Sequence, residues 1–362
     1  MPGLPLDTPI LTTTGWSANG DLRPGDQLVD PLGTATSVRS LTSTRTSEIY
    51  AVAIRDGSEV VVAADQLWEV AVRDTNNVRR TQVLTTEGLK RQVERKGYQV
   101  LIPKMNAFCF RTSPDLPVDP YLLGILLAEG ALSEETLSFA CHADDFEIVA
   151  RIEKLLPEGH EIKSYGPNDV KRKITVGNYG GAQRARNTRG RNLVLNAVHE
   201  LGLRGTQSDT KFIPELYMRA PLDDRLDLLR GVLDGDGSIK ADGNIRFASA
   251  SPALAEGVRE LVLSLGGRAR ITTKTGRSYT YNGVKVPSKD EYWINGICGL
   301  EVNPFFLARK AMFFRPLPKS DSYARRVMAV TPIGYGQVRA VRLSADSHFV
   351  ACGLPLVGDP GA

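Results

Sequence analysis

The chain has 362 residues with 45 Lys and Arg against 41 Asp and Glu, a formal charge of +4, and 42% of its residues are hydrophobic. This length favours two or three domains with sizeable cores, and the composition excludes a disordered or fibrous protein. The longest apolar stretches run for about ten residues, whereas a membrane span needs about 20. The sequence shows no secretory leader at its start, and its four cysteines form no CxxC pair. We therefore expect a cytoplasmic protein without a membrane partner, a disulfide scaffold or a thiolate zinc site.

The first 110 residues or so combine short β-branched runs with turn signals. Thr8–Thr13 precedes the turn Arg23-Pro24-Gly25-Asp26, and a further turn precedes Glu59–Ala63. Regular turn signals between such runs are typical of an all-β domain. The same pattern of β-branched runs recurs at Val338–Val350, so both ends of the chain are predicted to be β-rich.

The zone from about 115 to 320 contains a repeated segment. Tyr121–Gly130 reads YLLGILLAEG, and Leu228–Gly237 reads LLRGVLDGDG. Each copy places an apolar helix before a small residue, an acid and a glycine, and each precedes a candidate strand and a helical pattern. These patterns are Thr136–Ala140 with Asp144–Leu156, and Asn244–Ala248 with Ser251–Leu265. A duplicated α/β unit is the economical interpretation.

Small residues lie four apart on one face of each repeated helix, at Gly124 and Ala128 and at Gly231 and Gly235. Small residues at this spacing let two helices approach closely. If the two copies pack together, Glu129 and Asp236 meet at the negative ends of the helices and repel each other unless a cation lies between them. Mg²⁺ would satisfy both carboxylates, and such a site can activate water for phosphodiester cleavage.

Two other interpretations of these segments are possible. Both helices could be ordinary core helices that end in glycine, which is a common helix stop. A calcium loop beginning at Asp234 is the second, but its sixth position would need Gly and is Ile239, and its twelfth would need Glu and is Ile245. The paired-carboxylate interpretation is the strongest because the pattern occurs twice.

The two segments resemble the paired motifs of LAGLIDADG homing endonucleases, and the flanking β zones resemble the split splicing domain of an intein. The resemblance implies a mixed fold with a discontinuous all-β intein (Hint-type) domain over 3–115 and 322–359. An α/β endonuclease is inserted over 116–321, with two αββαββα repeats at about 116–220 and 221–321. It also implies that Glu129 and Asp236 bind two or three shared Mg²⁺ ions; the first copy has Leu127 where the family frequently has an earlier acid, which is not the metal ligand.

The family usually has a lysine upstream of the second motif in a Lys-x-Ile-Pro context. Lys211-Phe212-Ile213-Pro214 matches it, 25 residues before Asp236. The resemblance implies a catalytic lysine that polarises the scissile phosphate or the attacking water; the alternative is a surface lysine. We expect the symmetry-related lysine near Glu291–Ile297, with Lys289 as the first choice and Lys285 as the second.

Basic residues are concentrated in the repeat zone, where residues 151–220 hold 13 Lys and Arg against 7 Asp and Glu. Clustered basic side chains suit phosphate contacts and guanine edges in double-stranded DNA, although a charge run can also be a solvated face. A second patch in the β zone resembles the extra DNA-contacting arm of some intein endonucleases. The candidates are Lys171, Arg172, Lys173, Arg184, Arg186, Arg189 and Arg191 in the first copy, Arg246, Arg268, Arg270, Lys274 and Arg277 in the second, and Lys90 and Arg91 in the arm.

The block Leu4–Thr12 resembles the first conserved block of inteins, but the splicing groups are replaced. The initial Cys or Ser corresponds to Gly3, the Thr-x-x-His block to Ala63 through Gln66, and the terminal His-Asn pair to Gly358 and Asp359. His348 remains in the preceding strand, where a structural hydrogen-bonding role is expected. We therefore expect splicing to be inactive.

The sequence predicts a monomeric, site-specific DNA endonuclease that makes double-strand breaks at a long asymmetric target. Two alternatives belong to other classes. One is a self-splicing intein with a vestigial endonuclease, and the other is a DNA- or RNA-binding protein that does not cleave.

Overall fold

The computed structural model describes residues 2–103, 105–110, 114–132, 136–164, 166, 170–176, 192–276, 278–281, 284–316, 325–344 and 348–359. It forms two compact units. The first comprises Met1–Thr112, Leu263–Gly267 and Leu317–Ala362, and the second comprises Ser113–Val262 and Arg268–Pro316. Among the described residues, no helix combines the length and apolar character needed to cross a membrane.

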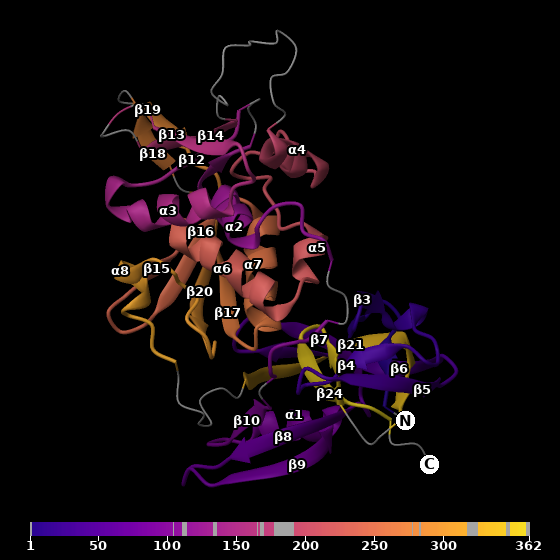
Figure 1. Cartoon of the computed structure of the whole chain (residues 1–362). Coiled ribbons are helices and arrows are strands. Elements are labelled where there is room, and N and C mark those ends of the chain that lie inside the picture. Colours follow the sequence, from indigo (N-terminus) through magenta and orange to yellow (C-terminus); the bar gives the residue numbers. More distant parts are fainter. Residues whose placement is uncertain are drawn as a thin grey trace. The chain divides into compact units, whose positions relative to one another are not determined.

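The first unit is built from antiparallel sheets to which both ends of the chain contribute (Figure 1). One sheet has the order β7-β6-β21-β10-β8-β9, with β1 paired to β21, and the other has the order β22-β5-β4-β2-β23-β24, with β3 paired to β2. The strands are β1 (Leu4–Pro5), β2 (Pro9–Thr12), β3 (Gly15–Ala18), β4 (Gln27–Val29), β5 (Ala35–Leu41), β6 (Arg45–Ile54), β7 (Glu59–Ala63), β8 (Leu67–Arg73), β9 (Arg79–Thr85), β10 (Gln99–Ile102), β21 (Arg325–Arg339), β22 (Val341–Leu343), β23 (His348–Ala351) and β24 (Leu354–Val357).

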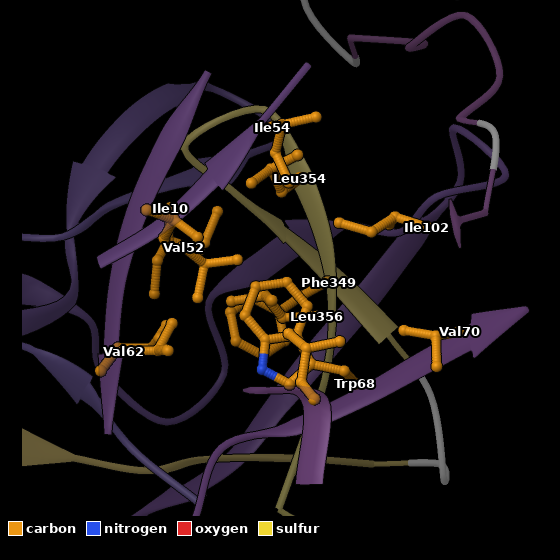
Figure 2. Close-up of a cluster of buried hydrophobic side chains, with 14 of the residues drawn as sticks. Ile10, Val52, Ile54, Val62, Trp68, Val70, Ile102, Phe349, Leu354 and Leu356 are labelled. Atoms are coloured by element: carbon orange, nitrogen blue, oxygen red, sulfur yellow. The ribbon is translucent and has the colours of Figure 1, made fainter. Parts of the chain in front are cut away.

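The core of this unit joins residues from the two ends of the chain. Trp68, Phe349 and Leu356 belong to one cluster of buried side chains (Figure 2). The indole of Trp68 is fully buried and donates its N–H to Thr86 Oγ1 at 3.0 Å, so its polar atom is satisfied. The buried side chains alternate along their strands, and the sheet that contains β2, β4 and β23 carries a second buried cluster, with Leu11, Val29 and Val350, on its other face.

One helix interrupts the β-rich first unit. The sequence predicted strands throughout this zone, but Thr86–Glu94 forms helix α1, and the side chain of Thr85 caps it by accepting from the N–H of Gly88 at 3.2 Å. Lys90 and Arg91 therefore lie on a helix, where Arg91 is exposed and Lys90 is half-buried. The N-cap and the straight-chain residues of this segment favour the helix.

The second unit contains two four-stranded antiparallel sheets with the same strand order, β11-β12-β14-β13 and β15-β16-β20-β17, and a separate hairpin of β18 and β19. In chain order its elements are α2 (Pro120–Glu129), β11 (Gly130–Ala131), β12 (Ser138–Ala140), the 3₁₀ turn η2 (Ala143–Asp145), α3 (Phe146–Leu155), β13 (His160–Ser164), β14 (Lys171–Val176), α4 (Leu193–Glu200), α5 (Glu215–Met218), α6 (Leu222–Asp236), β15 (Ser238–Ile239), β16 (Ile245–Ser249), α7 (Pro252–Ser264), β17 (Arg268–Lys274), β18 (Ser278–Tyr281), β19 (Val284–Pro287), β20 (Glu291–Cys298) and α8 (Ala308–Ala311).

Helix α2 begins where the sequence provides both a cap and a helix-compatible proline. The carboxylate of Asp119 accepts from the backbone N–H groups of Tyr121 and Leu122, and Pro120 occupies the first turn, where its missing N–H costs nothing. Residues 120–127 are all buried, so α2 is a core helix that is covered on every side. The helices and strands predicted after each repeated segment are confirmed to within about two residues.

Candidate active site

Helices α2 and α6 pack together through facing glycines. A Cβ at Gly231 would lie 2.2 Å from the carbonyl oxygen of Tyr121, and one at Gly124 would lie 2.4 Å from that of Leu228. One turn later, a Cβ at Gly235 would lie 2.7 Å from Cβ of Ala128. These distances are too short for any side chain, so the predicted close approach of the two helices is confirmed.

The two helices end side by side on Glu129 and Asp236. The same hypothetical Cβ at Gly235, directly before Asp236, would be 3.4 Å from Cγ of Glu129. Glu129 is half-buried and Asp236 is more exposed. Burial raises the pKa of both carboxyl groups, and the negative charge of Glu129 adds to the effect of burial and raises the pKa of Asp236 to about 6. The two acids therefore form the electrostatically coupled pair that the repeat predicted.

A buried lysine lies beside each acid and caps the helix that carries it. Nζ of Lys211 donates to the carbonyl oxygens of Leu126, Leu127 and Gly130 at 2.7–3.1 Å, at the end of α2. Nζ of Lys310 donates to those of Leu233 and Asp234 at 2.8 Å, at the end of α6.

The two lysines also share one electrostatic environment. Each is only 5% exposed, and burial lowers the pKa of each to about 8, although the nearby acids act in the opposite direction. The site thus holds two acids and two lysines in a pseudo-symmetric arrangement.

The lysine at the end of α6 is Lys310, whereas the sequence predicted Lys289 for this role. Lys289 lies before β20, has a side chain that is 52% exposed, and pairs with Asp209 at 2.8 Å. Lys285 is exposed on β19. The prediction placed the second lysine before the last strand of its repeat, whereas Lys211 and Lys310 both follow the sheet. A usable signal was present, because Lys211 follows Glu129 by 82 positions (129 to 211) and Lys310 follows Asp236 by 74 (236 to 310).

Asp234, the first acid of the second segment, has a structural role. Its carboxylate is fully buried and accepts from the hydroxyl of Tyr121 at 3.0 Å and from the backbone N–H groups of Phe306 and Leu307 at 3.0–3.2 Å. Burial raises its pKa despite these donors. Asp234 therefore fixes the segment that leads into α8 and does not face the acid pair as a ligand.

The basic residues of the second repeat line one face of its sheet. Arg246 on β16 and Arg270 on β17 both lie opposite Asn295 on β20, so the three side chains form a row across the sheet. Lys274 lies further along, with Nζ 3.9 Å from the ring centroid of Trp293, and Arg268 lies at the other end of β17. The opposite face carries buried residues such as Phe247 and Ile294. The two faces of this sheet therefore differ, with one polar and basic and the other buried.

The basic run of the first repeat is divided between two faces of its sheet. Lys171 and Lys173 share one face of β14, whereas Arg172 lies opposite the buried Phe139 on the other face and donates to Ser164 Oγ at 3.2 Å. Because neighbours in a strand point to opposite faces, Lys171 and Lys173 share one surface and Arg172 lies on the other. The predicted contacts Arg184, Arg186, Arg189, Arg191 and Arg277 lie outside the described residues.

The positions that the intein resemblance aligns with splicing groups converge in the first unit. The carbonyl oxygen of Gly3 accepts from the N–H of Ala63 at 2.9 Å, and the N–H of Gln66 donates to the carbonyl of Ala63 at 3.1 Å. The Gln66 amide then donates to the carbonyl of Val357, directly before Gly358, at 2.9 Å. Backbone segments near both ends of the chain are thus linked through the counterpart of the Thr-x-x-His block.

The side chains at these positions make structural contacts. Asp359 accepts from Arg342 Nε at 2.8 Å and is almost fully buried. His348 Nε2 lies 3.0 Å from a carboxylate oxygen of Glu69. A side chain at Gly3 would be tight, since its Cβ would lie 3.1 Å from Cγ2 of Val338.

Comparison with known proteins gives three kinds of similarity. Residues 223–299, which run from α6 to β20, match the LAGLIDADG-like domain. Over 98% of its length the chain is 28% identical to the replicative DNA helicase DnaB of Mycobacterium intracellulare, and it spans 57% of that relative.

Similar solved structures include an Msm DnaB1 intein splicing domain bound with zinc, at 31% identity over 27% of this chain and 72% of that one, with a TM-score of 0.21. They also include I-DmoI in complex with DNA and Mn, at 16% identity over 50% of this chain and 89% of that one, with a TM-score of 0.32. The predicted resemblance to LAGLIDADG proteins is confirmed over residues 223–299 by the family match.

Proposed function

We propose that this chain is a site-specific endonuclease that makes double-strand breaks in DNA with divalent metal ions. The observation that carries the proposal is the pair of acids, Glu129 and Asp236, on adjacent helix ends, each accompanied by one buried lysine. Two acid–lysine pairs in one chain match two scissile phosphates. A single chain is therefore sufficient, and the unlike acids suit a long target with unlike half-sites.

The donor set at the site fits a hard cation. Both acids supply carboxylate oxygens, and a divalent ion would offset the burial and the neighbouring negative charge of Glu129 that raise the pKa of Asp236. The described residues contain no group of three or more His, Cys, Asp and Glu that could hold a metal, so water and DNA phosphates would complete the coordination. Glu129 and Asp236 would hold two or three Mg²⁺ ions between them. When bound, such ions activate water and stabilise the leaving oxygen.

The two lysines add positive charge beside the acid pair. With a pKa of about 8, Lys211 and Lys310 are largely protonated at pH 7 and place positive charge beside the acids. Lys310 uses two of its three N–H donors on carbonyl oxygens and can donate the third to a phosphate oxygen or a water, whereas Lys211 uses all three and acts through its charge. Lys211 belongs to the end of α2 and Lys310 to the end of α6, so each lysine would serve the strand nearest its own acid.

DNA would lie across the polar faces of the two sheets. Lys171 and Lys173 on β14, and Arg270 and Lys274 on β17, support this placement because they share the exposed faces. The arginines between 184 and 191, and separately Lys90 and Arg91 on α1 of the first unit, are further proposed DNA contacts.

We also propose that the first unit is a discontinuous, Hint-type splicing domain that no longer splices, with the endonuclease inserted between its two segments. Support comes from the hydrogen-bond chain from Gly3 through Gln66 to Val357, which joins the two former junctions. Gly3 has no nucleophilic side chain, and Gln66 is used in a backbone hydrogen bond.

The test takes its DNA substrate from the coding sequence of the DnaB relative. Because the chain is similar to a DnaB helicase, a plasmid carrying the helicase coding sequence without this chain's segment is the first target, with a randomised plasmid library beside it. We expect Mg²⁺-dependent cleavage of both strands that chelation and the variants Glu129→Gln and Asp236→Asn abolish. Tight binding without cleavage in either DNA would overturn the proposal and favour a binding protein, and spontaneous release of terminal segments would favour a self-splicing intein.

A further inference from the structure

An ion pair between the two repeats lies directly beside Lys310. Arg309, its neighbour in α8, contacts both carboxylate oxygens of Asp145, from Nε to Oδ1 at 2.6 Å and from Nη2 to Oδ2 at 2.8 Å. Asp145 ends the turn before α3 in the first repeat, and its side chain is only 10% exposed. This bidentate geometry is the strongest form of arginine–carboxylate pairing. The first repeat therefore binds the segment that carries Lys310 in the second repeat.

Helix α8 needs such contacts to keep its position. It has four residues, and a helix this short is not stable by itself. The backbone N–H of Ala308 donates to Glu147 Oε2 at 3.0 Å, and Asp234 accepts from the two residues before it. Both Asp145 and Glu147 belong to the first repeat, whereas Asp234 belongs to the second, so α8 is held by both repeats.

The same arrangement occurs at the other lysine with different chemistry. Ser251 directly precedes α7 in the second repeat, as Asp145 directly precedes α3 in the first. Its hydroxyl is fully buried and donates to the carbonyl oxygen of Lys211 at 2.5 Å. Each repeat thus uses the residue before its second helix to hold the lysine segment of the other. One contact is a buried neutral hydrogen bond, and the other is an ion pair whose arginine is 56% exposed.

We propose that Asp145 and Arg309 form a positioning latch through which the first repeat holds Lys310 at the end of α6, so that cleavage of the strand served by Asp236 and Lys310 depends on this ion pair. The proposal rests on the proposed endonuclease function. Asp145 also lines a cavity of about 310 Å³ together with Glu129 and with Gly235, the residue before Asp236. Asp145 and Arg309 are positioning residues, since they act through Lys310.

The cleavage test compares the two strands of a supercoiled target plasmid under single-turnover conditions. Arg309→Gln and Asp145→Asn should each slow one strand by about tenfold or more relative to the other, the size of a lost charge-assisted contact, so that nicked circles accumulate. The double variant should be no slower than either single variant, because the two residues act as one unit. The dissociation constant for DNA should stay within about twofold, since neither residue contacts DNA in this proposal.

Two variants separate positioning from general damage to the fold. Arg219→Gln removes a local ion pair with Glu215 on α5 and should leave both strand rates unchanged. Arg309→Lys retains one charged contact and should restore part of the lost rate. Equal slowing of both strands by Arg309→Gln, or no slowing at all, would overturn the latch.

A second measurement does not depend on cleavage. Acetylation of each lysine by a small reagent, quantified by mass spectrometry, reports how well Lys310 is protected. Arg309→Gln should raise the rate for Lys310 several-fold and leave that for Lys211 unchanged, because Ser251 still holds the Lys211 segment. Unchanged protection of Lys310 would overturn the latch even if the wild type cleaves. A wild type that never cleaves would overturn only the endonuclease proposal.

Discussion

Replacing Gly231 by alanine should force α2 and α6 apart. The added methyl group would lie 2.2 Å from the carbonyl oxygen of Tyr121 and 2.9 Å from Cα of Gly124. Non-bonded heavy atoms prefer about 3.5 Å, so the helices would have to separate by about 1 Å. The obstacles are backbone atoms that cannot rotate away, and overpacking of this kind costs about 1–3 kcal/mol or more. The better helix propensity of alanine offsets about 1 kcal/mol of that cost. At the upper end of the range, which these backbone obstacles favour, a net destabilisation of about 2 kcal/mol is left.

Thermal unfolding of the full chain measures this loss. For a unit of this size, about 2 kcal/mol corresponds to a Tm decrease of roughly 4–8 °C in the transition of the second unit. Gly88→Ala in α1 is the matched control, because its Cβ would have no neighbour closer than 3.4 Å, and it should not lower Tm. Cleavage by Gly231→Ala should also fall, since the carboxylates move with their helices. A Gly231→Ala variant as stable and as active as the parent would refute the claim that this contact sets the site.

Four further outcomes are expected. Asp236→Asn and Glu129→Gln should each lower cleavage by about 100-fold or more while DNA affinity in EDTA stays nearly constant, and strand-labelled assays should show that they slow different strands. Because the pKa of Asp236 is raised to about 6, its ionised form reduces the stability of the metal-free protein above that pH, so the Tm increase caused by Mg²⁺ should be larger at pH 7.5 than at pH 5 and smaller in Asp236→Asn. Arg270→Ala and Lys274→Ala should each weaken DNA binding and reduce its salt slope by about one; an unchanged slope would assign them to a solvated face. Intact mass should remain constant for a day at neutral pH with thiol, since Gly3 cannot form a thioester; loss of a terminal segment would contradict this.

Much of the site could be predicted from the sequence because its determinants are local. The repeated apolar segment, the small residues four apart and the acid before the final glycine all lie within ten residues of one another in each copy. Helix periodicity then requires the small residues to share a face and the acid to fall at the helix end. Lys211 was recognisable from its Lys-x-Ile-Pro context, and the structure places it against the end of α2.

Other parts of the site were decided only by tertiary structure. Lys310 reaches the end of α6 because a whole sheet returns the chain to that point, and the sequence near it carries no motif that distinguishes it from Lys289. The face on which Arg172 lies depends on the strand register, and a shift of one residue would reverse it. The role of Asp234 depends on donors about 72 residues away. Sequence patterns therefore determined which helices carry the acids, whereas the positions of the lysine segments depend on contacts between the repeats, which no local pattern records.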